Sequence, residues 1–141
     1  MAESEIGLLI EALRRFNEER DWTKFHDPKN LAMLLASEAG ELIALLRWVA
    51  SPDADAFVRD ARHRGKVEAE VADVAIALLL FCDRAGIDLA SAIREKLEVN
   101  RRNYPVELSR GHSARPDRPD EAPTTQGSPA GRSERSRQGT R

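Results

Sequence analysis

The chain has 141 residues, of which 41% are hydrophobic and 33% charged, a composition typical of one soluble globular domain. Its longest uncharged run of apolar residues, 74–82, is far shorter than the roughly 20 apolar residues that a membrane span needs, so we expect no membrane partner. Acidic residues come before any apolar run, which argues against a secretory signal. The single cysteine, Cys82, excludes an intramolecular disulfide and fits a reducing cytoplasm.

The net charge of −2 is unevenly distributed along the chain. Residues 106–141 hold 7 basic and 5 acidic side chains, which leaves 15 and 19 for residues 1–105 and gives that part a net charge of −4. An acidic body is unlike a nucleic-acid-binding protein, whose affinity depends on neutralising phosphates. We therefore expect no nucleic-acid partner, whereas a cation site is compatible with the excess of acid.

Helical periodicity accounts for the first part of the chain. Residues 4–20 place apolar side chains at spacings of three and four, which predicts an amphipathic helix. After a connector, a second helix is predicted to begin at Asp27-Pro28, because an acidic cap followed by proline is a common helix start. This helix is expected to run to about Ala50.

Two further main helices follow a polar connection over residues 51–65, which has room for a short helical turn. The third is predicted over about 66–84, and its second half is apolar on all sides, as expected for a helix surrounded by others. Gly86 is suited to end this helix, and Asp88 to cap a fourth that continues to about Asn103. With no convincing strand alternation, four main helices and short links predict an all-α antiparallel four-helix bundle.

The last residues of the chain differ from the rest in composition. Residues 112–141 are rich in Pro, Gly, Ser and Arg and contain three alanines but no other apolar residue. Such a segment cannot bury enough surface to offset the entropy of ordering, so we predict that it is disordered. A basic tail could touch RNA or a partner, although a solvated extension is the simpler interpretation. The helical domain is expected to comprise residues 1–111.

Four acidic residues interrupt or border the apolar faces of the second and third helices. Glu38 lies seven residues after Leu31, on the same face, and Glu41 lies one turn beyond it. Glu70 is on or beside the apolar face of the third helix, and Asp73 follows three residues later. Two consecutive helices therefore each present a pair of carboxylates, spaced i, i+3, that is directed partly inward.

Inward carboxylates are costly unless they are neutralised, and four together would repel one another. Basic partners, protonation or a divalent cation would relieve this repulsion, and the apolar faces carry no Lys or Arg to pair with all four. Mg²⁺ binds carboxylate oxygens and keeps positions for substrate phosphates. The alternative is that the acids border the apolar faces and reach solvent.

A di-iron bundle needs Glu-x-x-His on two helices, and the one acid-x-x-His motif, Asp60 to His63, lies in the polar connection, so we do not expect iron.

The predicted fourth helix carries a row of polar residues. Lys96, Asn100 and Tyr104 follow one another at i, i+4 steps, so they could contact a phosphate, a sugar or base edge, and a stacking surface. An amphipathic helix with a charged border is the alternative. Trp22 and Trp48 lie at helix edges and could stack on a base, although packing in a core or an interface is the commoner role of tryptophan.

Three segments together resemble the MazG-like superfamily of all-α nucleoside triphosphate pyrophosphohydrolases, and within it the dCTP pyrophosphatase branch. They are ERDWTKFHDPKNLAMLLASEAGELIALLRW, EAEVADVAIALLLFCDRAGIDL and KLEVNRRNYPVELSRG, and they cover roughly residues 18–111. The E-x-x-E and E-x-x-D pair is a modest signal alone, but it is strong in combination with FHDPKNL and NRRNYP in this order.

The resemblance implies a catalytic Mg²⁺ site and a water that attacks the α-phosphorus of a dNTP, giving dNMP and pyrophosphate, with a carboxylate as general base. It also implies a homo-oligomer, usually a tetramer in this branch, whose pocket includes a second subunit; a dimer is the other possibility. The implied metal ligands and catalytic residues are Glu38, Glu41, Glu70 and Asp73. The implied substrate-binding residues are Trp22 and Trp48 at the base, Lys96 against the phosphates with Asn100 and Tyr104 beside it, and His26, Lys29, Asn30 and Arg101 with less specific roles.

The sequence departs from the family pattern at a few positions. Ser37 stands where the wider superfamily often has the first of two adjacent glutamates, and Ala44 and Ala77 are small where larger or polar residues could shape a base pocket. We therefore expect a Mg²⁺-dependent enzyme that converts dCTP or a modified dCTP and sanitises the nucleotide pool. The alternatives are a house-cleaning relative with another base preference and a non-catalytic helical oligomer that binds a nucleotide or a partner.

Overall fold

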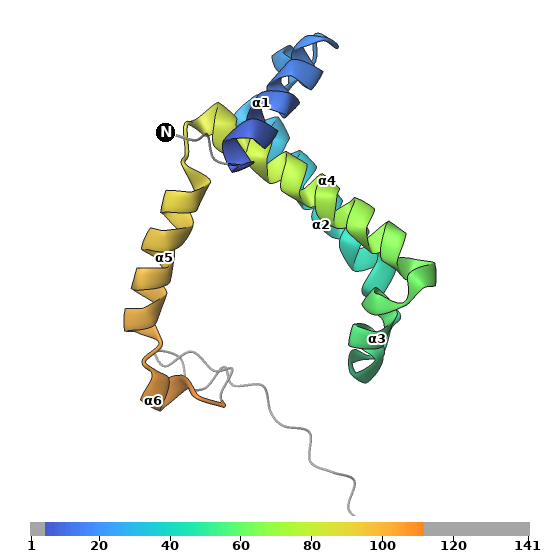
Figure 1. Ribbon diagram of the computed structural model, residues 1–141, viewed down its shortest axis with the longest axis vertical. Coiled ribbons are helices and arrows are strands. Elements are labelled where there is room, and N and C mark those ends of the chain that lie inside the picture. The colour runs from blue at the N-terminus through green and yellow to red at the C-terminus, as the bar shows by residue number, and fades with distance from the viewer. Residues whose placement is uncertain (1–4, 112–141) are drawn as a thin grey trace, which may run out of the picture. The chain divides into compact units, whose positions relative to one another are not determined.

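A computed structural model describes residues 5–111 of the chain (Figure 1). These residues form helices and no strand. The chain divides into two compact units between Arg94 and Glu95. In chain order the elements are α1 (Glu5–Glu18), the 3₁₀ helix η1 (Thr23–Phe25), α2 (Pro28–Leu46), the 3₁₀ helix η2 (Ser51–Asp53), α3 (Ala54–Arg59), α4 (Ala61–Ala85), α5 (Leu89–Asn103) and α6 (Val106–Ser109).

The all-α prediction is confirmed for the described residues, and two helix ends differ from expectation. α2 ends at Leu46, about four residues earlier than predicted. α4 begins at Ala61, about five residues earlier than predicted, because Asp60 caps it: the Asp60 carboxylate accepts a hydrogen bond from the Arg62 backbone N–H at 2.8 Å. Hydrogen bonds from the Arg62 side chain and backbone hold the pKa of Asp60 well below its usual range. The short helical turn expected before α4 is present as η2 and α3.

α2 and α4 lie side by side and antiparallel, and they form the main helix pair of the first unit (Figure 1). Leu31 of α2 and Ala77 and Cys82 of α4 are the fully buried apolar residues in the described part of the chain. Burying a leucine side chain contributes about 1.5–3 kcal/mol. The α2–α4 pair is therefore the frame against which α1 and α3 pack.

Arg14 joins α1 to the C-terminal end of α4. Its Nε lies 3.1 and 3.0 Å from the two carboxylate oxygens of Asp83, and its Nη2 contacts the same carboxylate. These hydrogen bonds, together with the negative charge of Asp83, raise the pKa of Arg14. A charge-assisted pair with two contacts fixes geometry better than a single hydrogen bond, so this pair restrains the orientation of α1 against α4.

The chain turns back after α1 in a way that positions Trp22. The backbone N–H of Trp22 donates to the Asn17 carbonyl at 2.9 Å, and Asp21 adopts a positive φ of 53°. The Trp22 ring packs edge-on against Phe16, with the ring centroids 5.9 Å apart. The turn therefore keeps an aromatic ring beside the end of α1.

Two predicted helix signals are confirmed. The Asp27 carboxylate accepts a hydrogen bond from the Asn30 backbone N–H at 3.0 Å, and Pro28 occupies the start of α2. Gly86 follows α4 in the left-handed conformation, with a φ of 66°. A residue with a Cβ is strained at this φ, so the backbone conformation itself favours glycine here.

The second unit contains α5 from Glu95 onward and the short helix α6, which the sequence analysis did not predict. The place of α5 in a four-helix bundle and a domain boundary at Gly111 stay predictions. The disordered tail predicted for residues 112–141 lies outside the described residues. Across residues 5–111, no helix combines the length and the apolar character that a membrane crossing requires.

The conformation of Gly86 yields a stability prediction. Gly86→Ala should lower the free energy of unfolding by about 1–2 kcal/mol, because alanine is strained at positive φ. Gly65→Ala is the matched control: Gly65 lies inside α4, and an added Cβ there meets no atom within 4 Å. This control should stabilise by roughly 0.5–1 kcal/mol. Urea unfolding measures both variants, and a shift of both in the same direction would contradict the assignment of Gly86.

Candidate functional site

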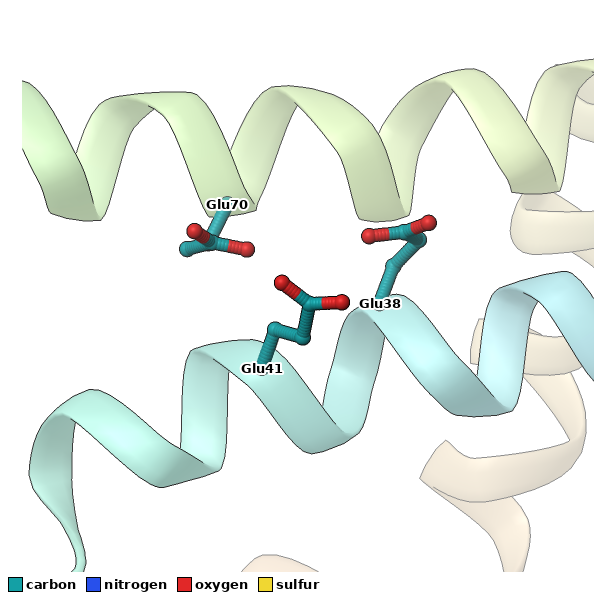
Figure 2. A group of neighbouring side chains, drawn as sticks. All are labelled: Glu38, Glu41 and Glu70. Atoms are coloured by element: carbon teal, nitrogen blue, oxygen red, sulfur yellow. The ribbon is translucent and has the colours of Figure 1, made fainter.

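Three glutamates from two helices converge between α2 and α4. Glu38 and Glu41 lie one turn apart on α2, and Glu70 faces them from α4, so that the three side chains share the space between the helices (Figure 2). Each offers a carboxylate oxygen, and these oxygens all lie within 4.8 Å of one another. Glu38 and Glu70 are half-buried and Glu41 is exposed. The antiparallel helix pair thus gathers carboxylates that are distant in sequence.

Asp73 lies one turn beyond Glu70 on α4 and is exposed. It is outside the group of three oxygens, but its charge acts on that group. Burial raises the pKa of the Glu38 carboxyl, and the negative charges of Glu41, Asp73 and Glu70 raise it further. Within residues 5–111, no Lys or Arg forms an ion pair with any of these four acids. Their mutual repulsion is therefore not offset by a basic partner in this part of the chain.

The donor set of this acidic group fits a hard divalent cation. It contains carboxylate oxygens without His or Cys, and oxygen donors are those that Mg²⁺ prefers. A bound cation would offset the repulsion and favour the ionised form of Glu38. The residues present therefore fit a magnesium site, although the full ligand set that includes Asp73 stays a prediction.

An apolar cavity of about 390 Å³ opens along the same helix pair. Leu34, which lines it, lies one turn before Glu38 on α2, and Ile76, which also lines it, lies one turn after Asp73 on α4. Small-molecule sites typically measure roughly 300–1,000 Å³ and combine apolar walls with a few polar groups. The cavity and the acidic group are therefore neighbours, one apolar and one strongly anionic.

The structure brings two of the predicted substrate-binding residues to this cavity, since Trp22 and His26 both line it. Asn30 serves the local fold: its Nδ2 donates to the Phe25 carbonyl at 3.0 Å and closes the turn before α2. Lys29 is exposed in the first turn of α2.

Trp48 follows α2 and is not part of the cavity lining. Its side chain is 87% exposed, and the Arg47 guanidinium lies 5.5 Å from its ring centroid. A role for Trp48 in enclosing a base stays a prediction.

Sequence reasoning missed Asn17, which also lines the cavity and is 6% exposed. The signal was present in the sequence. Asn17 lies four residues after Leu13 and seven after Ile10, so it interrupts the apolar face of α1 as Glu38 interrupts that of α2.

The remaining predicted residues belong to the second unit. Lys96 and Asn100 lie on α5, and Tyr104 follows it, with its backbone N–H donating to the Asn100 carbonyl at 2.8 Å. The Arg101 guanidinium pairs with Glu98 one turn away. The row of polar residues along α5 is thus present within this unit, and its relation to the acidic group stays a prediction.

Comparisons with known proteins agree with this geometry, although no family model matches the chain. The chain is 37% identical over 110 residues to dCTP pyrophosphatase 1 of Bos taurus and 37% identical over 108 residues to that of Homo sapiens. The matched regions cover 75% and 74% of this chain, and 65% and 64% of those proteins, just under two thirds of their length.

A solved structure gives the fuller match. The crystal structure of a pyrophosphatase from Archaeoglobus fulgidus is 40% identical in sequence and superimposes with a TM-score of 0.69, covering 74% of this chain and 96% of that one. Sequence and fold therefore agree that the chain belongs to the MazG-like superfamily of all-α pyrophosphohydrolases, in the branch that contains the dCTP pyrophosphatases.

Proposed function

We propose that the chain is a Mg²⁺-dependent nucleoside triphosphate pyrophosphohydrolase. Its substrate is a dNTP, dCTP or a modified dCTP, its products are the dNMP and pyrophosphate, and its role is sanitation of the nucleotide pool. The observation that carries the proposal is the group formed by Glu38, Glu41 and Glu70, which has no ion-pair partner in the described part of the chain. The dCTP activity named for the bovine and human relatives supports the choice of substrate.

The chain's own residues suggest how the reaction proceeds. Glu38, Glu41, Glu70 and Asp73 would hold the cation, which when bound neutralises phosphate charge and favours ionisation of water. A carboxylate oxygen of this set accepts a proton from the water that attacks the α-phosphorus. The bond between the α-phosphorus and its bridging oxygen then breaks, and pyrophosphate leaves.

The apolar cavity is suited to the base because it adjoins the acidic group. Trp22 supplies a ring for stacking and His26 a polar edge, and both line the cavity. The base would thus lie one helical turn, about 5.4 Å, from the residues that serve the phosphates. The further substrate contacts that we propose are Lys29, Asn30, Trp48, Lys96, Asn100, Arg101 and Tyr104.

A homo-oligomer is part of the same proposal. Leu8, Leu9 and Phe16 of α1 are each about half exposed, at 55%, 51% and 46%. A second copy that covered them would bury apolar surface at a gain of roughly 25 cal/mol per Å². We propose a tetramer or a dimer in the cytoplasm.

Pyrophosphate release tests the proposed reaction directly. The full chain should release pyrophosphate from dCTP in the presence of Mg²⁺ and lose this activity on addition of EDTA. If pyrophosphate is released from another dNTP but not from dCTP, the proposed reaction stands and the proposed base preference is wrong. If the folded protein releases no pyrophosphate from any of the four dNTPs or their 5-modified forms, the alternative of a non-catalytic binding module is favoured.

Glu70 provides the sharpest test of the acidic group. Glu70→Gln keeps the size of the side chain but removes its charge, and turnover should fall at least about 100-fold because charge stabilisation at the phosphates is lost. Glu68→Gln is the matched control, since Glu68 lies on the same helix, is exposed and pairs with Arg64 at 2.6 Å. Its turnover should stay within about twofold. Circular dichroism checks helical content, and unchanged turnover in the Glu70 variant would rule out the assignment.

Mg²⁺ should also stabilise the folded chain without any substrate. At 100 times its Kd, the ion adds about 2.7 kcal/mol to the free energy of unfolding, seen as a rise in Tm. The raised pKa of Glu38 means that the metal-free folded state binds a proton more tightly than the unfolded state. The metal-free protein therefore loses stability as the pH rises through that pKa, whereas Mg²⁺ stabilises most at the higher pH. If Mg²⁺ does not change the Tm at any pH, the proposed metal site is contradicted. An equal rise in Tm in Glu70→Gln and the wild type would contradict it as well.

A further inference from the structure

Asn17 is the buried polar residue of the described chain, and its side chain has no partner there. Only 6% of the residue is exposed. Its backbone carbonyl accepts hydrogen bonds from the backbone N–H groups of Arg20 at 3.3 Å and Trp22 at 2.9 Å. Its side-chain amide makes no hydrogen bond within residues 5–111. Its amide atoms are not fully enclosed, because within residues 5–111 the completely buried side-chain atom without a partner is Ser109 Oγ, so the Asn17 amide is open to a ligand or water.

The amide lies at the wall of the apolar cavity. Asn17 lines both the 390 Å³ cavity and an adjoining one of about 200 Å³. α2 and α4 contribute only apolar side chains, such as Leu34 and Ile76, to the larger cavity. Of its polar members, His26 is half-buried and Asn17 is 6% exposed. A ligand that fills this cavity therefore meets an amide without a hydrogen-bond partner among mostly apolar walls.

An amide offers one donor and one acceptor side by side. That pattern matches the edge of a nucleobase, where side-chain amides pair through two hydrogen bonds. A phosphate would need donors alone, and an apolar ligand would leave the amide unpaired. The apolar walls and the Trp22 ring suit the faces of the same planar ring.

We propose that Asn17 determines base selectivity by pairing with the Watson–Crick edge of cytosine. Its Oδ1 accepts from the exocyclic amine, and its Nδ2 donates to the ring N3. This inference rests on the proposed function and specifies the group that selects the substrate. Asn17 acts on the base alone, while the acidic group, which lies one turn from Leu34 of the cavity wall, acts on the phosphates.

The test removes the exocyclic amine from the base and, separately, the amide from the protein. The wild-type full chain should favour dCTP over its 2-pyrimidinone analogue, which lacks the exocyclic amine, by roughly 10- to 100-fold in kcat/KM. Asn17→Leu should bring this ratio to within about threefold, because the variant cannot distinguish the two bases. Arg15→Leu is the control, since Arg15 is exposed on the opposite side of α1, and its ratio should match the wild type.

Thermal unfolding shows whether Asn17 recognises the base or instead stabilises the fold. Asn17→Leu replaces an unpaired amide with an apolar side chain of similar size, so its Tm should equal or exceed that of the wild type. A lower Tm together with an unchanged base ratio would make Asn17 structural and overturn the proposal. If the leucine variant does not fold, the ratio of kcat/KM for dCTP to that for the analogue is measured on Asn17→Ala instead.

The outcomes distinguish this inference from the proposed function. Turnover with an unchanged base ratio in Asn17→Leu keeps the reaction and overturns the role of Asn17. Faster turnover of a different dNTP likewise keeps the reaction and overturns cytosine pairing. If no dNTP is turned over, the proposed function fails, and calorimetric Kd values for dCTP and its analogue then give the ratio. A ratio that is the same in wild type and variant, or no binding at all, overturns the inference.

Discussion

Repulsion among carboxylates between α2 and α4 is the constraint on which the arrangement of the site depends. Glu38, Glu41 and Glu70 present oxygens within 4.8 Å of one another, and burial adds to the cost of ionising Glu38. Without a cation this arrangement opposes the pairing of the two helices, because like charges in a partly desolvated space cannot all ionise freely. The helices are held together elsewhere along their length, where Leu31 and Ala77 are buried. The fold thus places its apolar packing beside a site that is unfavourable until it is filled.

On the same helix pair, apolar and acidic side chains are separated by one helical turn. A helical period of about 5.4 Å puts Leu34 and Glu38 on one face of α2, one apolar and one charged. α4 repeats the arrangement with Ile76 and Asp73. A nucleotide has this same polarity, with a planar base at one end and a charged phosphate chain at the other. Two helices with offset apolar and acidic turns can therefore match it, and Trp22 and His26 from the segment between α1 and α2 complete the cavity wall.

Local sequence signals predicted the elements of this frame well, because each depends on a few neighbouring residues. Asp27 before proline and Gly86 after an apolar run mark the ends of α2 and α4 through hydrogen-bonding and φ requirements that act locally. The early start of α4 was missed because Asp60 was treated as part of a polar connection, although aspartate is a strong cap. The 87% exposure of Trp48 depends on tertiary packing, which periodicity does not encode.

Asn17 and Glu38 are both polar residues within an apolar helix face. They differ in the kind of ligand that can pair with the polar group. A carboxylate needs opposite charge, which a small hard cation supplies without regard to the shape of the ligand. A neutral amide needs a donor and an acceptor at defined positions, which a ligand of matching shape provides. Ile76 and Leu80, which α4 contributes to the cavity wall, have no polar atom in their side chains, so α4 offers a base no hydrogen bond there. Under the proposal made above, selectivity for the base comes from the other wall of the cavity, where Asn17 of α1 lies.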